Sequence, residues 1–358
     1  MNRKSLLWIL LAIAVVIGCF FLLKNKEPDI SQKKIVKIGA ILPLTGKAAV
    51  VGNMARDGLL FAQIYINDSI LQKTNKKIEI IIEDGEGSPT KSLSALNKLL
   101  IRHNCNIVFS IISPVDLSIL TIQKKQKFLF ISHASHPRLS NVNNLVFRHS
   151  QTVEQEFKVI DKAIGQDWNE VAYIYVNDDY GTSFNNLIKQ NNSNHYSEIA
   201  INSNEGVNKS VIDKMLNRKP KYIVLNGSTP ILMQVINALK EKAFKGEIYL
   251  CLGFAATGGM TQDLSGLSIN CIDFNLETQS NNISEAFEAN FHSKFGPNQI
   301  IFFNSALLIG NAIREGYVMP TNIAGYIKSL KEFKGVNERI VISATNDILP
   351  PIMLKKIN

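Results

Sequence analysis

The segment VKIGAILPLTG, residues Val36 to Gly46, carries the clearest indication of how this chain folds. Residues 36–42 are apolar and partly β-branched, and Pro43 ends the run, which is typical of a short buried strand. Thr45-Gly46 to Gly52 forms a polar loop with little bulk, and apolar residues then recur at helical spacing from Val51 as far as Ile66. A strand that leads through a glycine-containing loop into a helix begins a βαβ unit. Ligands of such folds bind at the carboxyl ends of the strands.

The rest of the chain alternates between strand and helix patterns. We expect strands at 77–83, 107–111, 128–132, 145–148, 171–176, 198–201, 222–225, 248–252, 269–274, 339–343 and 352–357. We expect helices at 88–101, 113–125, 152–164, from 183, and at 207–216, 229–242, 283–295, 304–315 and 322–330. This alternation predicts an α/β fold of parallel sheets flanked by helices. A chain of 358 residues is long for one core and suits two domains.

Three of the predicted helices begin with a hydroxyl residue followed by proline: Ser88-Pro89, Ser113-Pro114 and Thr229-Pro230. The hydroxyl is expected to cap the first turn, and proline fits the first helical position because no partner for an N–H is needed there. Each pair follows a strand end, so the free amides should face one edge of the sheet, where they favour an anion such as a carboxylate. Asp116, in the first turn after Ser113, would compete with such an anion.

The composition is that of a globular protein, with 46% hydrophobic and 19% charged residues. The net charge of +9 is expected to serve solubility or attraction to an anionic membrane surface. No run of lysine and arginine is interleaved with aromatic residues, so we expect no nucleic-acid partner.

The N-terminus carries an export or anchoring signal. Arg3-Lys4 precedes the uncharged run Leu6–Leu23, which is just long enough to span a bilayer. Val16–Cys19 resembles a bacterial lipobox, which makes Cys19 a lipidation candidate, although the apolar run continues past it. An uncleaved anchor helix and a cleaved signal peptide are the alternatives. Each of them places the folded part outside the cytoplasm, and the first two tether it to the membrane.

Four cysteines are few, and there is no CxxC motif. Cys105 is expected to pack in a core. Cys251 and Cys271 follow or lie in successive apolar strands, where two buried thiols are favoured over a disulfide.

Signals of catalysis are weak. The sequence contains no GxGxxG after a strand, no P-loop, no GxSxG and no HExxH. His133 and His136 flank a loop after a predicted strand, and a metal site or a general base there is the minor interpretation, because no third ligand is evident. Adjacent carboxylates at Glu83-Asp84 and Asp178-Asp179 point opposite ways in an extended segment and form no dyad. We expect no enzyme activity, no cofactor and no metal.

Several motifs occur in a fixed order: IGAILPLTG…G…DG within residues 38–58, then Glu83-Asp84 with Ser88-Pro89, Phe130 to Pro137, Asn177 to Gly181 and Phe291 to Gly296. This set resembles the leucine/isoleucine/valine-binding family of periplasmic solute-binding proteins over roughly residues 35–358. The resemblance implies a two-lobed type I periplasmic-binding-protein fold. Its three hinge crossings are expected near Arg148, Asn275 and Arg339.

The resemblance also implies a ligand site. By position in the motifs, Ser113, Ala134 and Ser135 would bind the carboxylate and amino group of the ligand. Tyr180 of the second lobe would close over the ligand, and Val51 would line its side-chain pocket. Polar groups in a mostly apolar cleft suit a small amphipathic molecule.

The sequence departs from the family at the partner of the ligand ammonium. Gly253 or Phe254 stands where amino-acid binders have an acidic residue, and Ser228 stands where an aromatic residue is expected. A buried ammonium without a counter-charge is costly. A ligand with a carboxylate or amide but no cation, or with an aromatic part that meets Phe254, therefore fits better than a branched-chain amino acid.

We expect an anchor at 1–23, a tether at 24–34, a first lobe from 35–148 with 277–340, and a second lobe from 149–276 with 341–358. The resemblance implies a monomer that captures a small amino-acid-like, amide or carboxylate ligand and delivers it to an ABC-type permease. The alternative is a membrane-anchored envelope protein of the same fold that acts as a regulatory or assembly factor through protein partners.

Overall fold

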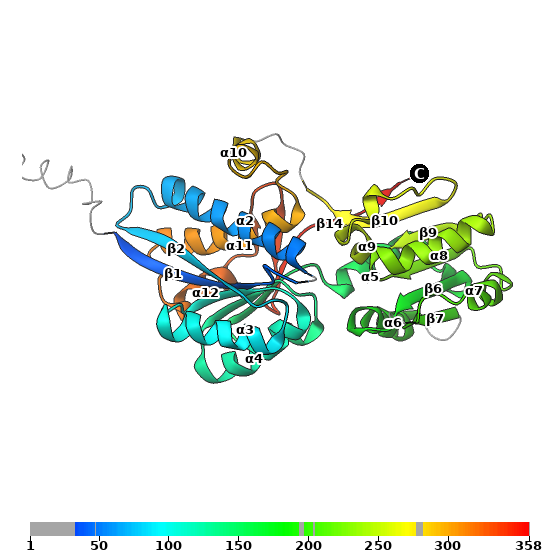
Figure 1. The fold of residues 1–358 in the computed structure, drawn as a ribbon, viewed down its shortest axis with the longest axis horizontal. Helices are drawn as coiled ribbons and strands as arrows, with labels where there is room; N and C mark the ends of the chain where they lie inside the picture. Colours follow the sequence, from blue (N-terminus) through cyan, green and yellow to red (C-terminus); the bar gives the residue numbers. More distant parts are fainter. Residues whose placement is uncertain (1–32, 47, 193–196, 203–204, 277–281, 358) are drawn as a thin grey trace, which may run out of the picture.

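The computed structural model describes residues 33–357 except 47, 193–196, 203–204 and 277–281. The expected anchor at 1–23, with Cys19, and almost all of the expected tether lie outside the described residues. Lys34, the last residue assigned to the tether, is the first residue of strand β1. The described chain forms two α/β lobes placed one after the other along the long axis of the molecule (Figure 1).

The first lobe is built on an eight-stranded sheet with the order β11-β12-β13-β5-β4-β3-β1-β2. Its strands are β1 (Lys34–Leu42), β2 (Lys76–Asp84), β3 (Ile107–Ser110), β4 (Leu129–Ser132), β5 (Val146–His149), β11 (Glu332–Lys334), β12 (Arg339–Ile342) and β13 (Asp347–Leu349). β1 to β5 pair in parallel with their neighbours. β1 begins at the end of the lobe farthest from the second lobe and runs towards it (Figure 1). The carboxyl ends of β1, β3 and β4 therefore face the second lobe.

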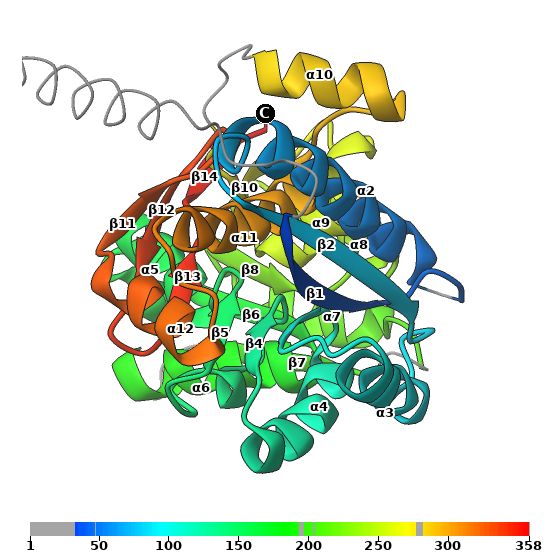
Figure 2. The ribbon, with the colours of Figure 1, turned by 90° about the vertical axis from the view of Figure 1, so that its left-hand side faces the viewer.

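Helices cover both faces of this sheet (Figure 2). One face carries α2 (Ala49–Tyr65), α11 (Pro297–Arg314) and α12 (Pro320–Ser329), whose apolar residues share one core with β1 and β2, and α10 (Asn282–Phe291) adds Phe287 to that core. The other face carries α3 (Pro89–Asn97) and α4 (Ser113–Gln126). α2 and α11 approach so closely at Gly58 that a Cβ there would lie 2.3 Å from the carbonyl oxygen of Gln299. Glycine at this position lets the two helices touch.

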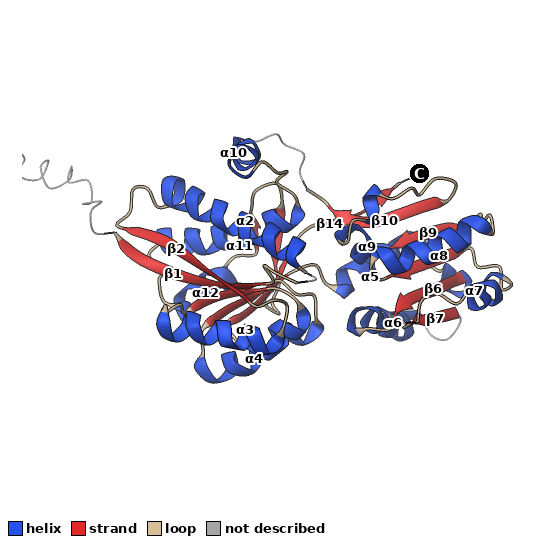
Figure 3. Cartoon of the chain, viewed as in Figure 1, coloured by secondary structure: helices blue, strands red, loops and turns tan. Residues whose placement is uncertain are grey.

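The second lobe is built on a six-stranded sheet with the order β14-β10-β9-β8-β6-β7. Its strands are β6 (Val171–Val176), β7 (Ser197–Ile201), β8 (Tyr222–Asn226), β9 (Glu247–Leu250), β10 (Ser268–Phe274) and the antiparallel β14 (Ile352–Lys356). α5 (Val153–Ile164) and α6 (Asp179–Asn192) pack on one face, and α7 (Lys209–Leu216), α8 (Thr229–Glu241) and α9 (Leu252–Ala256) lie towards the other (Figure 3). α5 begins with the predicted capping box of Thr152 and Gln155.

The chain crosses between the lobes three times. The first two crossings follow β5 and β10, as expected near Arg148 and Asn275. The third crossing expected near Arg339 is wrong, and so is the assignment of all of 341–358 to the second lobe. β12 and β13 stay in the first sheet because β13 pairs in parallel with β5, and the chain crosses at Pro350-Pro351. Neither proline carries an N–H for a ladder, which suits them to this connection.

Several boundaries also differ from those expected. α11 begins at Pro297 rather than at 304, because Gly296 is its N-cap and proline occupies its first turn. The strands β11 and β13 and the short helix α9 were not predicted. β11 and β13 have three residues each, and α9 has five, which is too short for periodicity to reveal.

Candidate functional site

The loop between β1 and α2 lies at the edge of the first lobe that faces the second lobe, and Asp84 organises it. Its carboxylate accepts hydrogen bonds from the amides of Leu44 (3.0 Å) and Glu86 (2.8 Å) and from the hydroxyl of Thr45 (2.7 Å). Burial raises the pKa of Asp84, but these hydrogen bonds together lower it below its usual value. Asp84 therefore stays ionised and holds the loop. Glycine is required at position 52 for the loop to pack this closely, because a Cβ there would lie 2.1 Å from the carbonyl oxygen of Pro43.

Ser113 is the first residue of α4 and is half-buried. The expected capping by hydroxyl groups is wrong at all three Ser/Thr-Pro starts, since no side-chain cap bond is made at α3, α4 or α8. Proline does occupy the first turn of each helix, as predicted. The Ser113 hydroxyl has no hydrogen-bond partner among the described residues, so it remains available to a ligand.

Asp116 does not compete for an anion in the way expected. Its side chain is buried beneath the start of α4 and accepts a hydrogen bond from Ser132. Burial raises the pKa of Asp116 to about 7, although the hydrogen bond from Ser132 partly offsets this. A carboxyl with a pKa of about 7 is uncharged in roughly half of the molecules at pH 7, so it offsets the positive end of the helix dipole less than an ordinary aspartate would and leaves part of it for another anion.

The loop Ala134–His136 follows β4, next to the end of β3, as the register of Ser110 with Ser132 requires. The Ala134 amide already donates to Ser132 Oγ (3.2 Å), so it has less to offer a ligand than expected. Ser135 is half-buried, and its hydroxyl has no hydrogen-bond partner within the described part of the chain. The carbonyl oxygens of Ser135 and His136 accept hydrogen bonds from Arg148 at 2.9 and 3.2 Å.

His133 and His136 do not form a joint site. His133 is buried, stacks on Phe302 and lies 2.8 Å from Ser305 Oγ, which is also 2.6 Å from Nδ1 of His149. Burial lowers the pKa of His133 to about 3, so its ring is neutral and structural. His136 Nε2 instead lies 3.2 Å from Asp179 Oδ2 in the second lobe. No group of three His, Cys, Asp or Glu side chains that could hold a metal occurs in the described residues.

Tyr180 lies at the start of α6 in the second lobe, but its hydroxyl points into that lobe. It donates to the carboxylate of Glu156, whose oxygens lie 2.6 and 2.5 Å away, and Glu156 also accepts from the amide of Leu252 (2.9 Å). Burial raises the pKa of Glu156 to about 7, against the lowering effect of these hydrogen bonds. The hydroxyl expected to bind the ligand is thus engaged elsewhere, and only the partly exposed ring remains at the edge.

The structure explains the missing acidic residue in the second lobe. A Cβ at Gly253 would lie 2.9 Å from the carbonyl oxygen of Gly227 and 3.3 Å from the Tyr180 ring. A carboxylate has no room at this position. Glu156 is the nearby carboxyl that sequence reasoning missed, because the capping box that begins α5 predicts a helix but not which side chain turns inward.

Ser228 and Phe254 have different surroundings. Ser228 is the half-buried N-cap of α8, and its hydroxyl makes no capping bond. Phe254 is fully buried in the core of the second lobe, where its ring packs against Gly259. The contact expected between Phe254 and an aromatic ligand is therefore not available in this structure, because α9 turns the ring inward.

A pocket of about 400 Å³ lies between the lobes. The first lobe contributes Met54 and the start of α11, and the second lobe contributes Ala255, Asp273 and Phe274. Val51 is half-buried one turn before Met54 on α2. Ser135 and Tyr180 approach each other from opposite lobes, since their neighbours His136 and Asp179 are in contact. The predicted residues thus gather at two facing edges, beside the pocket rather than in its lining.

The remaining predictions concern cysteines and membrane spans. Cys105, Cys251 and Cys271 are buried free thiols, as favoured by the sequence. Among the helices of the described residues, none has the length and apolar character needed to cross a bilayer.

Comparison with known proteins identifies the class. A family model described as periplasmic binding protein matches residues 35–347. No curated protein matches the sequence. Among solved structures, the leucine-binding protein LivK of Thermotoga maritima is similar with a TM-score of 0.73 and 15% identity over 90% of this chain and 97% of that chain.

Two further structures were determined with ligands. A substrate-binding protein of Desulfitobacterium hafniense in complex with Leu has a TM-score of 0.74 and 16% identity, over 91% of this chain and 98% of that chain. An R. palustris solute-binding protein in complex with benzoate has a TM-score of 0.70 and 14% identity, over 91% and 94% of the two chains.

The two-lobed architecture, the interlobe pocket and the family match agree. The chain belongs to the periplasmic binding protein family, and its fold is of type I, as predicted. It is a solute-binding protein of the extracytoplasmic space and not an enzyme.

Proposed function

We propose that this protein captures a small organic ligand bearing a carboxylate or an amide between its two lobes. The observation that carries the proposal is the pocket of about 400 Å³ whose lining comes from both lobes. This volume lies in the range of small-molecule sites. The free hydroxyls of Ser113 and Ser135 at the adjoining edge of the first lobe supply hydrogen-bond donors for an anionic or amide group.

The ligand class follows from the charges at the site. Gly253 leaves no room for the carboxylate that would balance a ligand ammonium, and the Glu156 carboxyl is engaged by the Tyr180 hydroxyl and the Leu252 amide. The pocket lining holds one charge of each sign, Asp273 and Lys294, which offset each other. A ligand without a cation is therefore favoured, such as a 2-oxo acid, an aromatic acid or an amide. Benzoate, bound by the similar R. palustris protein, is an acid of this kind.

The bound ligand would act through closure of the lobes. Side chains from both lobes line the pocket, so a ligand that contacts both stabilises the closed state. A closed, loaded form presents a surface that an ABC-type permease can distinguish from the empty form. Delivery to such a permease by a monomer is the function that we infer.

We also propose that residues 1–23 tether the protein to the membrane, through a lipid on Cys19 or an uncleaved helix. The uncharged run Leu6–Leu23 supports this. Fractionation of cells that express Cys19→Ser separates the two modes. Release or an unprocessed form indicates lipidation, whereas unchanged size and attachment indicate an anchor helix.

Calorimetric titration tests the ligand proposal. We expect leucine, isoleucine and valine to bind poorly and their 2-oxo acids or benzoate to bind better. Ser113→Ala and Ser135→Ala should each weaken binding of the ligand so found about ten- to a hundredfold, because each removes a hydrogen bond to a charged group. Ser69→Ala, on the exposed surface of the same lobe, is the matched control. Micromolar leucine binding that survives Ser135→Ala would show that the site is misplaced.

A further inference from the structure

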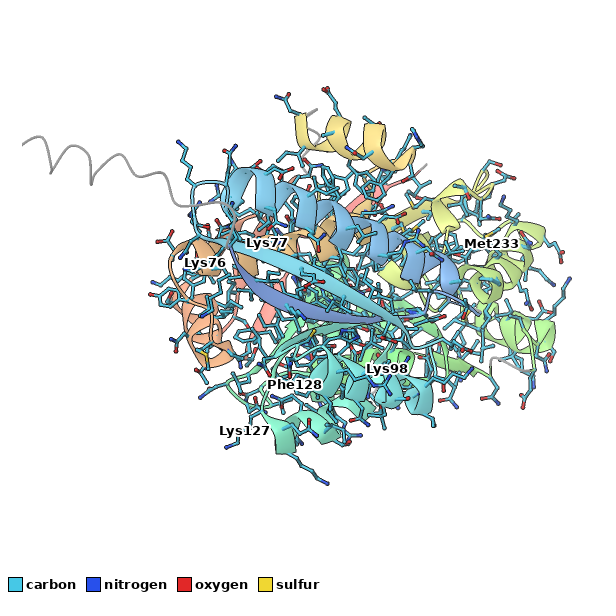
Figure 4. All side chains as sticks on the ribbon, turned by 60° about the vertical axis from the view of Figure 1, so that its left-hand side comes forward. Lys76, Lys77, Lys98, Lys127, Phe128 and Met233 are labelled. Carbon is cyan, nitrogen blue, oxygen red and sulfur yellow. The ribbon has the colours of Figure 1, made fainter. Side chains whose placement is uncertain are left out.

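Cationic side chains gather at the end of the first lobe that lies farthest from the second lobe. At this end the strands begin and the helices finish, and Lys76, Lys77 and Lys127 mark it in Figure 4. We call it the basic face, and its cations are Lys33, Lys34, Lys73, Lys76, Lys77, Arg102, Lys124, Lys125, Lys127 and Lys328.

These cations are not neutralised by neighbouring carboxylates. None of them has a carboxylate within 4.0 Å among the described residues, since the ion pairs of the first lobe involve other cations, such as Arg56, Lys91 and Lys98. Asp68 lies exposed at the same end, and Glu315 there is paired with Arg314. The basic face is therefore a region of uncompensated positive charge.

A cavity of about 690 Å³ opens within the basic face, between the end of α4, the loop before β5, and α12. Lys124, Lys127 and Lys328 line it together with apolar Val142 and Leu145, and no carboxylate contributes to its lining. Lys328 Nζ donates to Asn144 Oδ1 (2.8 Å), so its ammonium is oriented but not neutralised. This lining suits an anionic group attached to an apolar body.

Large apolar side chains are exposed on the same face. Ile35 at the start of β1 is 44% exposed, and Ile101, next to Arg102, is 72% exposed. Tyr317 and Met319, in the turn after α11, are 40% and 60% exposed. Apolar and aromatic side chains among cations are typical of surfaces that lie in the headgroup region of a bilayer.

The sequence places this face close to a membrane if residues 1–23 act as a tether. Lys33 follows the last residue of the uncharged run, Leu23, by ten positions. Ten residues span at most about 35 Å. The basic face is the part of the first lobe from which β1 starts, so it is the part that such a tether holds nearest to the bilayer.

We propose that the basic face docks on an anionic phospholipid bilayer and that the cavity between α4 and α12 binds a phosphate-bearing headgroup. Strand β1 has nine residues and runs from this face towards the cleft. Its length places the cleft roughly 30 Å from the bilayer. The empty protein would thus be held with its cleft open to solvent, independently of which ligand it binds.

Amine footprinting of the full chain tests this proposal. The protein is reconstituted in lipid nanodiscs made of phosphatidylcholine alone or mixed with phosphatidylglycerol, and acetylation of each lysine is followed by mass spectrometry. We expect Lys124, Lys127 and Lys328 to react at least about fivefold more slowly on the anionic discs. A factor of about five corresponds to the attraction expected between one cation and such a surface. Lys158, Lys162 and Lys214 of the second lobe should react equally on both. Salt at 1 M, where the Debye length is about 3 Å, should remove the difference.

A charge-removal variant provides the matched comparison. Lys124→Gln/Lys127→Gln/Lys328→Gln should reduce the protection of Lys73 and Lys77 as well, whereas Lys158→Gln/Lys162→Gln/Lys214→Gln should leave it unchanged. Equal rates on neutral and anionic discs would overturn the proposal. So would equal protection by inorganic phosphate without lipid, which would indicate a site for a soluble anion. Protection confined to native membrane vesicles would indicate a protein partner and would likewise overturn it.

Discussion

Arg148 and Asp347 form a buried ion pair, with Nε of the guanidinium 2.8 Å from Oδ1 of the carboxylate. The two residues lie on the adjacent strands β5 and β13, which precede two of the three crossings between the lobes. The same guanidinium donates to the carbonyl oxygens of Ser135 and His136. One ion pair thus holds together two hinge strands and the loop that is expected to contact the ligand.

Removal of either partner should have unequal effects on stability. Asp347→Leu leaves the Arg148 guanidinium buried without a counter-charge, which should cost about 3–5 kcal/mol. Arg148→Met should cost less. Asp347 keeps hydrogen bonds from the hydroxyls of Ser140 and Thr345, both at 2.8 Å, whereas the guanidinium left behind in Asp347→Leu keeps two carbonyl oxygens but cannot lose its charge. Urea unfolding measures both variants.

The exposed pair of Arg339 and Glu332 provides the control for this comparison. Arg339→Gln should change the free energy of unfolding by no more than about 1 kcal/mol. If Asp347→Leu proved no more costly than Arg339→Gln, the buried pair would not have the structural role assigned to it.

The alternation of strands and helices was sufficient to predict the α/β class, because buried parallel strands such as residues 36–42 leave an apolar run that periodicity detects. The two lobes were predicted from the chain length and from the family resemblance. The third crossing was misplaced for a physical reason. Whether residues 339–349 pair with the first or the second sheet depends on contact with β5, some two hundred residues away in the sequence, and no local pattern records it. Side-chain direction was equally hidden, because the burial of Tyr180 against Glu156 and of Phe254 against Gly259 is a tertiary property.

Tyr180→Phe should lower stability rather than ligand affinity. The substitution removes the hydroxyl that donates to buried Glu156, which should cost about 1–3 kcal/mol of unfolding free energy. Thermal unfolding with calorimetry measures it, and Tyr317→Phe on the exposed surface is the control. A Tyr180→Phe variant of unchanged stability that binds its ligand tenfold more weakly would mean that the hydroxyl turns to the ligand when the lobes close.

Asp116→Asn should stabilise the protein increasingly as the pH rises. The folded-state pKa of Asp116, about 7, exceeds the ordinary value of 3.8, so ionisation of this buried group costs stability above pH 4 until the cost levels off above pH 7. Between pH 5 and pH 8 the advantage of Asp116→Asn over the wild type should grow by roughly 2–3 kcal/mol.

Denaturant unfolding of both proteins at the two pH values measures this change. Asp167→Asn is the control, since Asp167 is exposed and its ion pair with Lys221 lowers its pKa instead. An advantage of Asp116→Asn that stays constant or shrinks with pH would show that Asp116 is ionised in the folded protein.

Asp179→Asn should shift the balance between open and closed lobes with little effect on the stability of either lobe. Asp179 Oδ2 lies 3.2 Å from His136 Nε2 across the cleft, and the Asp179 side chain is 81% exposed. The His136 side chain is only 9% exposed, but solvent screens the pair at its Asp179 end. Such a pair contributes about 1 kcal/mol, so its loss should change the ratio of lobe conformations by about fivefold. Single-molecule fluorescence transfer between dyes on the two lobes measures this ratio. Lys189→Gln breaks an exposed pair within the second lobe and should leave it unchanged. Equal ratios in Asp179→Asn and the wild type would show that the contact does not stabilise one arrangement of the lobes over another.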